Sequence, residues 1–157
     1  MADELVTTTV SDDLDNKIMT FFIEDVIYGI ELKNVIEIIS IQYITKVPNV
    51  PNYIKGIINL RGKIIPVIET RLKLDLEEVP YTDNTCIIVV TLNDITIGLI
   101  VDSVHEVLTL SNNSSSIPTK KTHKDKKYLK SVTKMGDNMI LSMDLNFFIN
   151  DDQLSND

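Results

Sequence analysis

The chain has 157 residues, of which 43% are hydrophobic, and its formal net charge is −8 at pH 7. This length allows one ordinary domain or two very small ones, with enough apolar residues to build a core. No apolar stretch approaches the roughly 18 residues of a membrane-spanning helix, and the polar, acidic start lacks the features of a signal peptide. A single cysteine, Cys86, excludes an internal disulfide. We therefore expect a cytoplasmic protein.

The negative charge lies at the two ends of the chain. Five acids and no bases precede residue 17, and three acids and no bases follow residue 149. Residues 17–149 therefore hold 15 acids and 15 bases and are neutral. This pattern predicts disordered acidic tails at 1–16 and 151–157. A neutral core gives nucleic-acid binding no overall electrostatic support.

Short, strongly β-branched runs bounded by turn residues predict strands. In chain order these runs cover residues 18–23, 26–30, 35–41, 57–60, 64–68, 87–92, 95–101, 104–110 and 139–143. Residues 24–25 and 93–94 stand where hairpin turns would lie. Many short strands with little helical periodicity favour an all-β sandwich or barrel. Helix is expected only near residues 49–55 and 144–150.

The chain also repeats itself. When residues 18–39 are placed over residues 87–108, a shift of 69, the apolar positions coincide and Gly29 falls on Gly98. Each copy alone would bury too little apolar surface to be stable. The repeat therefore predicts two small barrels, spanning residues 17–80 and 81–150. Glycines shared by both copies predict a close approach between strands.

A second block of the repeat separates structural residues from functional ones. Residues 53–69 match residues 128–144 at a shift of 75. Where the first copy reads Asn-Leu-Arg-Gly, the second reads Lys-Met-Gly-Asp, so the fold does not require Arg61. Gly62 suits a turn and places Arg61 at a hairpin tip. If this hairpin lies beside the third predicted strand, the guanidinium would reach the Glu37 carboxylate.

No arrangement of residues predicts an active site. Asp102, His105 and Glu106 are close in sequence, but a metal centre would need further ligands from elsewhere. His123 is the only other histidine. Cys86 stands at a strand start with no activating base beside it, which predicts an inert thiol. The motifs of phosphate loops and nucleophile elbows are absent. We therefore expect neither an enzyme nor a cofactor.

Two surface features have more than one interpretation. The basic run from Lys120 to Lys134 is typical of a solvated loop, but it would also suit an acidic partner or RNA. Its only aromatic residue is Tyr128, which gives little support for base stacking. The apolar run at 38–41, continued by Tyr43 and Ile44, would either contact a partner or be buried between the barrels.

Three segments carry a family resemblance. They are DVIYGI at 25–30, IKGIINLRGKIIPVI at 54–68 and GLIVDSV at 98–104. Together they resemble the CheW family, and the likeness runs in order from Lys17 to Ile149. It departs at 69–71, where Glu-Thr-Arg replaces the usual Asp-Leu-Arg. The chain leaves no room for a kinase or a receiver domain, so the likeness is to a free-standing member of the family.

The resemblance implies two tandem SH3-like barrels of five strands each. It also implies a non-catalytic adaptor that couples chemoreceptors (methyl-accepting chemotaxis proteins) to the histidine kinase CheA in bacterial chemotaxis. Such an adaptor would be cytoplasmic, associated with receptor arrays at the inner membrane, with no inserted segment and no bound nucleic acid. The alternative from another class is a small β-barrel nucleic-acid-binding protein that uses the run from Lys120 to Lys134.

The resemblance further implies two sets of contact residues. The receptor-binding residues would be Val35, Glu37, Ile38, Arg61 and Val104. The kinase-binding residues would be Ile41, Tyr43, Ile44 and Gly56.

Overall fold

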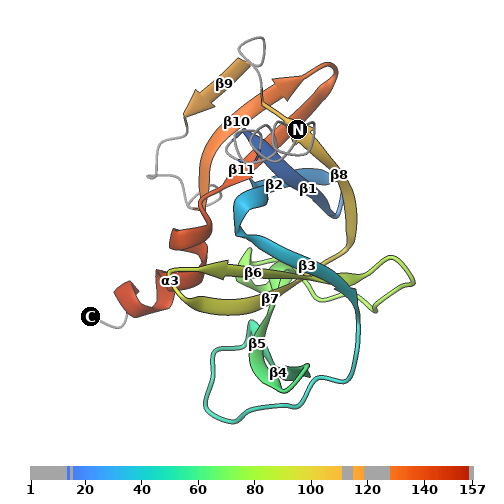
Figure 1. Cartoon of the computed structure of the whole chain (residues 1–157), viewed down its shortest axis with the longest axis vertical. Helices are drawn as coiled ribbons and strands as arrows, with labels where there is room; N and C mark the ends of the chain where they lie inside the picture. Colours follow the sequence, from blue (N-terminus) through green and yellow to red (C-terminus); the bar gives the residue numbers. More distant parts are fainter. Residues whose placement is uncertain (1–13, 15, 111–114, 119–127, 156–157) are drawn as a thin grey trace, which may run out of the picture. The chain divides into compact units, whose positions relative to one another are not determined.

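The computed structural model describes residues 14, 16–110, 115–118 and 128–155, in which strands predominate (Figure 1). The strands are β1 (Lys17–Ile23), β2 (Val26–Glu31), β3 (Val35–Ser40), β4 (Ile54–Leu60), β5 (Lys63–Glu69), β6 (Cys86–Leu92), β7 (Ile95–Val101), β8 (Ser103–Thr109), β9 (Ser115–Pro118), β10 (Leu129–Met135) and β11 (Asn138–Met143). The helices are η1 (Leu32–Asn34), α2 (Thr70–Lys73) and α3 (Leu145–Ser155). All nine predicted strands and the all-β fold class are confirmed. Within the described ranges, no helix has the length and apolar character needed to span a membrane.

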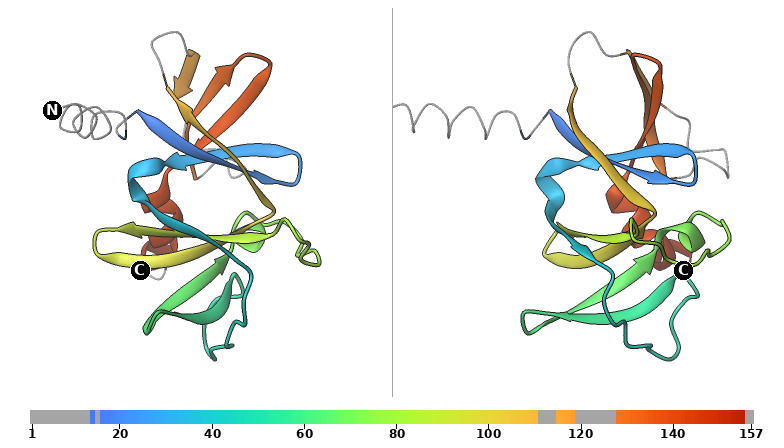
Figure 2. Two further views of the ribbon diagram at one scale, coloured as in Figure 1. Left: turned by 45° about the vertical axis from the view of Figure 1, so that its right-hand side comes forward. Right: turned by 90° about the vertical axis from the view of Figure 1, so that its right-hand side faces the viewer.

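The strands form two sheets (Figure 2). One has six strands in the order β8-β1-β2-β11-β10-β9, and the other has five in the order β3-β6-β7-β5-β4. The chain correspondingly divides into two compact units. Unit 1 holds the described residues of 1–20, 26–33 and 105–157, and unit 2 holds residues 21–25 and 34–104.

The internal repeat is confirmed strand by strand. The first copy supplies β1 to β5, and the shifts of 69 and 75 residues carry these strands onto β6, β7, β8, β10 and β11. The strand registers repeat as well: Val67 pairs with Gly98 in one parallel ladder, and Ser142 pairs with Gly29 in the other. A Cβ added to Gly98 would lie 2.7 Å from the Ile87 side chain, so glycine permits this close approach.

The compact units do not follow the predicted boundary at residue 80, because the two copies exchange strands. The first copy places β1 and β2 in the six-stranded sheet, and it places β3, β4 and β5 in the five-stranded sheet. The second copy does the reverse, with β6 and β7 in the five-stranded sheet and the rest in the other. Four strand pairings therefore join the copies: β8–β1, β2–β11, β3–β6 and β7–β5.

The six-stranded sheet has one strand more than predicted. In that sheet Ile117 of β9 pairs with Val132 of β10. The corresponding residue of the first copy is Ile57, which pairs with Thr45 in an isolated bridge. The sixth strand is thus the longer counterpart of a single bridge, and it follows the part of the chain that contains the six inserted residues.

The helix predicted near residues 49–55 is absent, and this prediction is wrong. The segment consists of bends and turns that lead into β4. Pro48 and Pro51 disfavour a helix, since proline restricts the residue before it and has no N–H to donate. Asn49 adopts a φ of 62°, and the Ile54 N–H donates to the Pro51 carbonyl across 3.0 Å, which closes a turn.

The helix predicted near residues 144–150 is confirmed, but α3 is longer and extends through the predicted acidic tail to Ser155. The Asp144 carboxylate accepts a hydrogen bond from the Phe147 N–H at 3.1 Å and caps the first turn. Once a helix is nucleated, each further residue adds a hydrogen bond at little cost. The fully buried Phe148 side chain packs edge-on against Tyr128, with ring centroids 5.1 Å apart, and so anchors α3.

Candidate partner-binding surfaces

The predicted contact between Arg61 and Glu37 is confirmed. Arg61 and Gly62 form the two-residue turn between β4 and β5, with φ values of 53° and 84°. The guanidinium reaches β3 and makes two parallel contacts with the Glu37 carboxylate, of 2.5 Å and 2.7 Å. This hydrogen bonding lowers the pKa of Glu37 and raises the pKa of Arg61. The Asn59 side chain accepts a hydrogen bond from the Gly62 N–H and fixes the turn.

The neighbours of Glu37 on β3 are exposed and apolar. Ile36 is 51% exposed and Ile38 is 40% exposed, whereas Val35 is half-buried where it pairs with Val90 of β6. A salt bridge flanked by exposed isoleucines is suited to binding a protein, because partner surfaces combine an apolar centre with a polar rim.

Val104 lies apart from this strand in the chain, near the start of β8, and it is half-buried. Its backbone hydrogen-bonds Cys86, whose thiol pKa is raised by burial. A raised pKa keeps the thiol protonated, which agrees with an unreactive cysteine.

The predicted kinase-contact residues differ in their exposure. The Tyr43 side chain is 85% exposed. Ile41 and Ile44 are partly buried and pack against the core of unit 2, which is formed by Ile58, Ile65, Val67, Ile87, Val89 and Ile100. Gly56 is buried, and a Cβ at this position would overlap the Thr45 carbonyl oxygen. Of these four residues, only Tyr43 presents its side chain freely to a partner.

A set of exposed apolar side chains that the sequence reasoning missed is present in both units. In unit 2 these are Ile38, Ile64 and Ile95, with exposures of 40%, 57% and 41%. The repeat carries these positions onto Val107, Met139 and Val26 of unit 1, with exposures of 42%, 51% and 37%. Both copies thus expose apolar residues where the fold needs none, and the shifts of 69 and 75 residues were the signal that could have found them.

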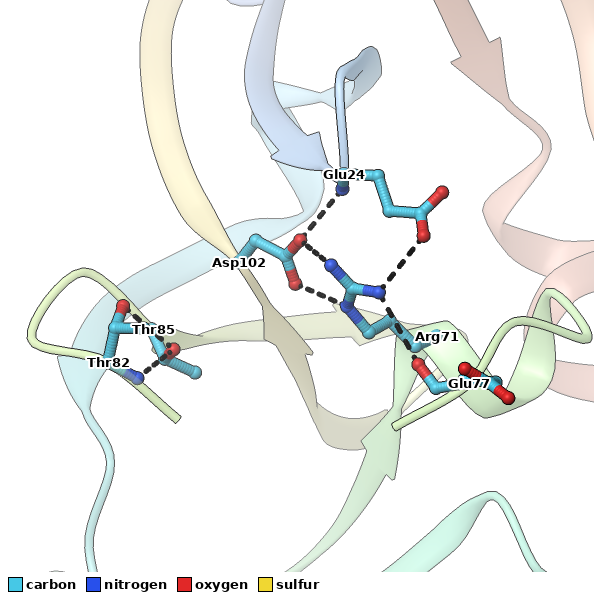
Figure 3. A network of polar contacts seen from close by, with 6 residues as sticks. All are labelled: Glu24, Arg71, Glu77, Thr82, Thr85 and Asp102. Carbon is cyan, nitrogen blue, oxygen red and sulfur yellow. Dashed lines mark hydrogen bonds and ion pairs between the residues drawn. The ribbon is translucent and has the colours of Figure 1, made fainter. Parts of the chain in front are cut away.

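A buried arginine forms the densest polar network in the described part of unit 2 (Figure 3). The Arg71 Nε donates to Asp102 Oδ1 at 2.9 Å, and Nη2 donates to Oδ2 at 2.5 Å. Its Nη1 contacts the Glu24 carboxylate at 3.3 Å and the Glu77 carbonyl at 3.4 Å. Asp102 also accepts the Glu24 N–H at 2.7 Å. Arg71 is only 7% exposed, so this network is structural.

Glu69, two residues before Arg71, is also buried, with an exposure of 2%. Burial raises its pKa to about 7, although the Tyr81 hydroxyl donates to the carboxylate at 3.3 Å. The equivalent residue of the second copy, Asp144, instead caps a helix with its carboxylate. The longer Glu69 side chain makes no such cap on α2 and lies inside the unit.

We expect Glu69 to make stability fall as the pH rises. The carboxyl ionises near pH 4.5 when unfolded but near pH 7 when folded, so the folded state binds the extra proton between these values. The free energy of unfolding should therefore decrease from pH 5 to pH 8 in the wild type relative to Glu69→Gln. Urea denaturation of both proteins at the two pH values measures the difference. Equal pH dependence in both would contradict this prediction, and Glu77→Gln is the exposed control.

The described residues offer little support for metal or nucleic-acid binding. No group of three or more potential ligands could hold a metal ion in this part of the chain. The run from Lys120 to Lys134 lies mostly outside the described residues. Of its lysines that are described, Lys130 pairs with Glu31 at 2.7 Å, and this contact lowers the pKa of Glu31.

Comparison with known proteins gives consistent results. A family model described as a CheW-like domain matches residues 17–153. The chemotaxis protein CheW of Klebsiella aerogenes is 28% identical over 151 residues, which cover 96% of this chain and 91% of that protein. The chemotaxis protein CheW of Bacillus subtilis is 38% identical over 109 residues, covering 69% and 70% of the two chains.

A solved structure is also similar. The crystal structure of a scaffolding protein CheW from Thermoanaerobacter tengcongensis matches with a TM-score of 0.78 and 36% identity. The match covers 85% of this chain and 92% of that one. The predicted architecture of two SH3-like barrels is thereby supported at the level of the whole fold.

Proposed function

Because the chain belongs to the CheW-like family, we propose that it is a non-catalytic adaptor that couples chemoreceptors to the histidine kinase CheA in bacterial chemotaxis. The observation that carries the proposal is the hairpin-tip contact between Arg61 and Glu37, flanked by exposed isoleucines on β3. The fold does not require this arginine, since the second copy has Gly136 in its place. Its retention in one copy points to a partner.

The receptor would bind the surface formed by β3 and the β4–β5 tip. Ile38 would supply apolar area, and the bidentate contact would hold Arg61 in one orientation toward the receptor. Val35 and Val104 are half-buried, so they would contribute mainly by shaping the backbone of their strands. An assembly in the cytoplasm, recruited to receptor arrays at the inner membrane, follows from this role.

The kinase would bind the segment that follows β3. Tyr43 would be its main contact, since an exposed tyrosine supplies a large amphipathic surface at low conformational cost. Ile41 and Ile44 would fix the segment on the core, and Gly56 would let it pass close to β4. Tyr43→Ala should therefore weaken kinase binding more than receptor binding.

Arg61→Ala should impair receptor coupling without unfolding the protein. The pair is exposed and screened by solvent, so its loss should leave the thermal unfolding midpoint nearly unchanged. Ile38→Asp should act in the same way, because it places a charge on an apolar contact surface. Receptor-stimulated kinase activity in reconstituted arrays measures the effect, with Lys46→Ala as an exposed control. Wild-type stimulation by both variants would refute the receptor surface.

A pulldown of the purified chain with a receptor tip fragment and with the kinase tests the proposal as a whole. Binding to both is expected. No retention of either partner would refute it. The nucleic-acid alternative is supported by none of the comparisons, which all lead to CheW proteins.

A further inference from the structure

Unit 1 contains the counterpart of the Glu37 site, with the carboxylate present and the arginine missing. The shift of 69 residues carries Glu37 of β3 onto Glu106 of β8, and the shift of 75 carries Arg61 onto Gly136 of the β10–β11 tip. Among the described residues, no lysine or arginine pairs with Glu106. Its printed charged neighbour is His105, whose Nε2 lies 3.3 Å from the Glu106 carboxylate.

The backbone of Glu106 is held firmly, so its side chain has a defined position. The Thr20 hydroxyl accepts the Glu106 N–H at 3.0 Å and donates to the Glu106 carbonyl at 2.5 Å. The carboxylate side chain is 54% exposed, about twice the 25% of Glu37 beneath Arg61. A rigid strand therefore presents an open carboxylate where the other unit has a covered one.

Space for a guanidinium exists at this tip. No atom lies within 4 Å of a Cβ built on Gly136, so the place that the Arg61 side chain takes in unit 2 is open here. Asp137 stands in the position of Gly62, and it makes the tip negative. The exposed Val26, Val107 and Met139 lie at positions equivalent to the isoleucines that expose apolar surface in unit 2.

We propose that Glu106 is a second docking point, which receives an arginine from a partner protein that also covers the apolar residues of unit 1. The occupant is inferred from the molecule itself, because the equivalent carboxylate in unit 2 is filled by a bidentate arginine. A guanidinium suits a carboxylate through two parallel hydrogen bonds, which a single imidazole cannot make. The negative tip supplies charge complementarity. This inference rests on the proposed adaptor function.

Two substitutions test the docking point in the full-length chain. Glu106→Gln removes the carboxylate charge. Gly136→Arg supplies the missing guanidinium within the same molecule, which should then occupy Glu106 and exclude the partner. The backbone at Gly136 has a φ of 63°, close to the 53° that Arg61 itself adopts, so an arginine is tolerated at this position. Gly136→Asn adopts the same backbone without a charge, and Asp94→Asn removes an exposed acid from unit 2.

Calorimetric titration with the receptor tip fragment and with the kinase gives the readout. Glu106→Gln and Gly136→Arg should each weaken binding of at least one partner by about tenfold or more, and the loss should shrink at high salt. The two control variants should bind as the wild type does. A structure of Gly136→Arg should show the new guanidinium on the Glu106 carboxylate.

The outcomes separate this inference from the function it rests on. If the wild type binds its partners and both test variants bind equally well, the docking point is refuted and the adaptor function stands. If the wild type binds neither partner, the adaptor function itself fails, and the docking point fails with it. If Val107→Asp abolishes binding but Glu106→Gln does not, the face docks a partner without an arginine, and the proposal is overturned.

Discussion

Replacing Arg71 by alanine is expected to lower the free energy of unfolding by about 3 kcal/mol or more, because it leaves the Asp102 carboxylate without its bidentate partner in a partly buried site. The loss should also free Glu24 and the Glu77 carbonyl from their shared contact. Urea denaturation followed by circular dichroism measures the change. Arg71→Lys should recover only part of it, since an ammonium cannot reproduce the fork.

A matched comparison separates burial from charge in this prediction. Arg61→Ala also removes an arginine from a bidentate carboxylate, but from an exposed one, so it should leave the unfolding curve nearly unchanged. Arg71→Ala with an unchanged midpoint would show that the buried network contributes nothing. If Arg71→Ala yields no folded protein, the partial recovery expected for Arg71→Lys still tests the role of the fork.

Replacing Gly56 by alanine is expected to destabilise the protein by about 2–4 kcal/mol. The new Cβ would overlap the Thr45 carbonyl, and the φ of 149° at this position disfavours a side chain. The bridge between Thr45 and Ile57 would have to open, and the segment that carries Tyr43 would shift. Thermal and urea unfolding of the purified variant give the size of the effect.

Gly62→Ala is the control for Gly56→Ala, since its φ is also positive but no atom lies near its added Cβ. It should cost only about 1–2 kcal/mol. If Gly56→Ala folds as stably as Gly62→Ala, then the close approach to Thr45 is not required. A variant that folds normally yet loses kinase binding would instead support a direct contact at Gly56.

The local features of the fold were predictable, because each depends on neighbouring residues. β-branched runs, turn dipeptides and the repeat predicted the strands, and the unmatched Arg61 predicted its contact with Glu37. The pairing of strands was not predictable in this way. The same alternating pattern is satisfied whether β3 pairs within its own copy or with β6, so the repeat identified two copies without showing that they exchange strands.

The buried polar residues were missed for a different reason. Arg71 and Lys73 follow a strand in a charged segment, where charged side chains are normally solvated. Yet the equivalent of Lys73 in the second copy is Phe148, a fully buried core residue. An apolar counterpart was therefore the signal that this position faces inward. Part of the candidate site was found by the opposite comparison, a polar residue with no counterpart at all.

The exchange of strands gives the chain an interdependence that separate modules lack. A linear array can lose one module and keep the next, whereas here each sheet is templated by both halves of the gene. Melting β6 and β7 would strip β3 and β5 of their ladders, and pulling β8 away would uncover β1. Partial unfolding of one half is thus coupled to the other, and exposed edges would invite aggregation. A scaffold laced together in this way transmits force between its partners as one body.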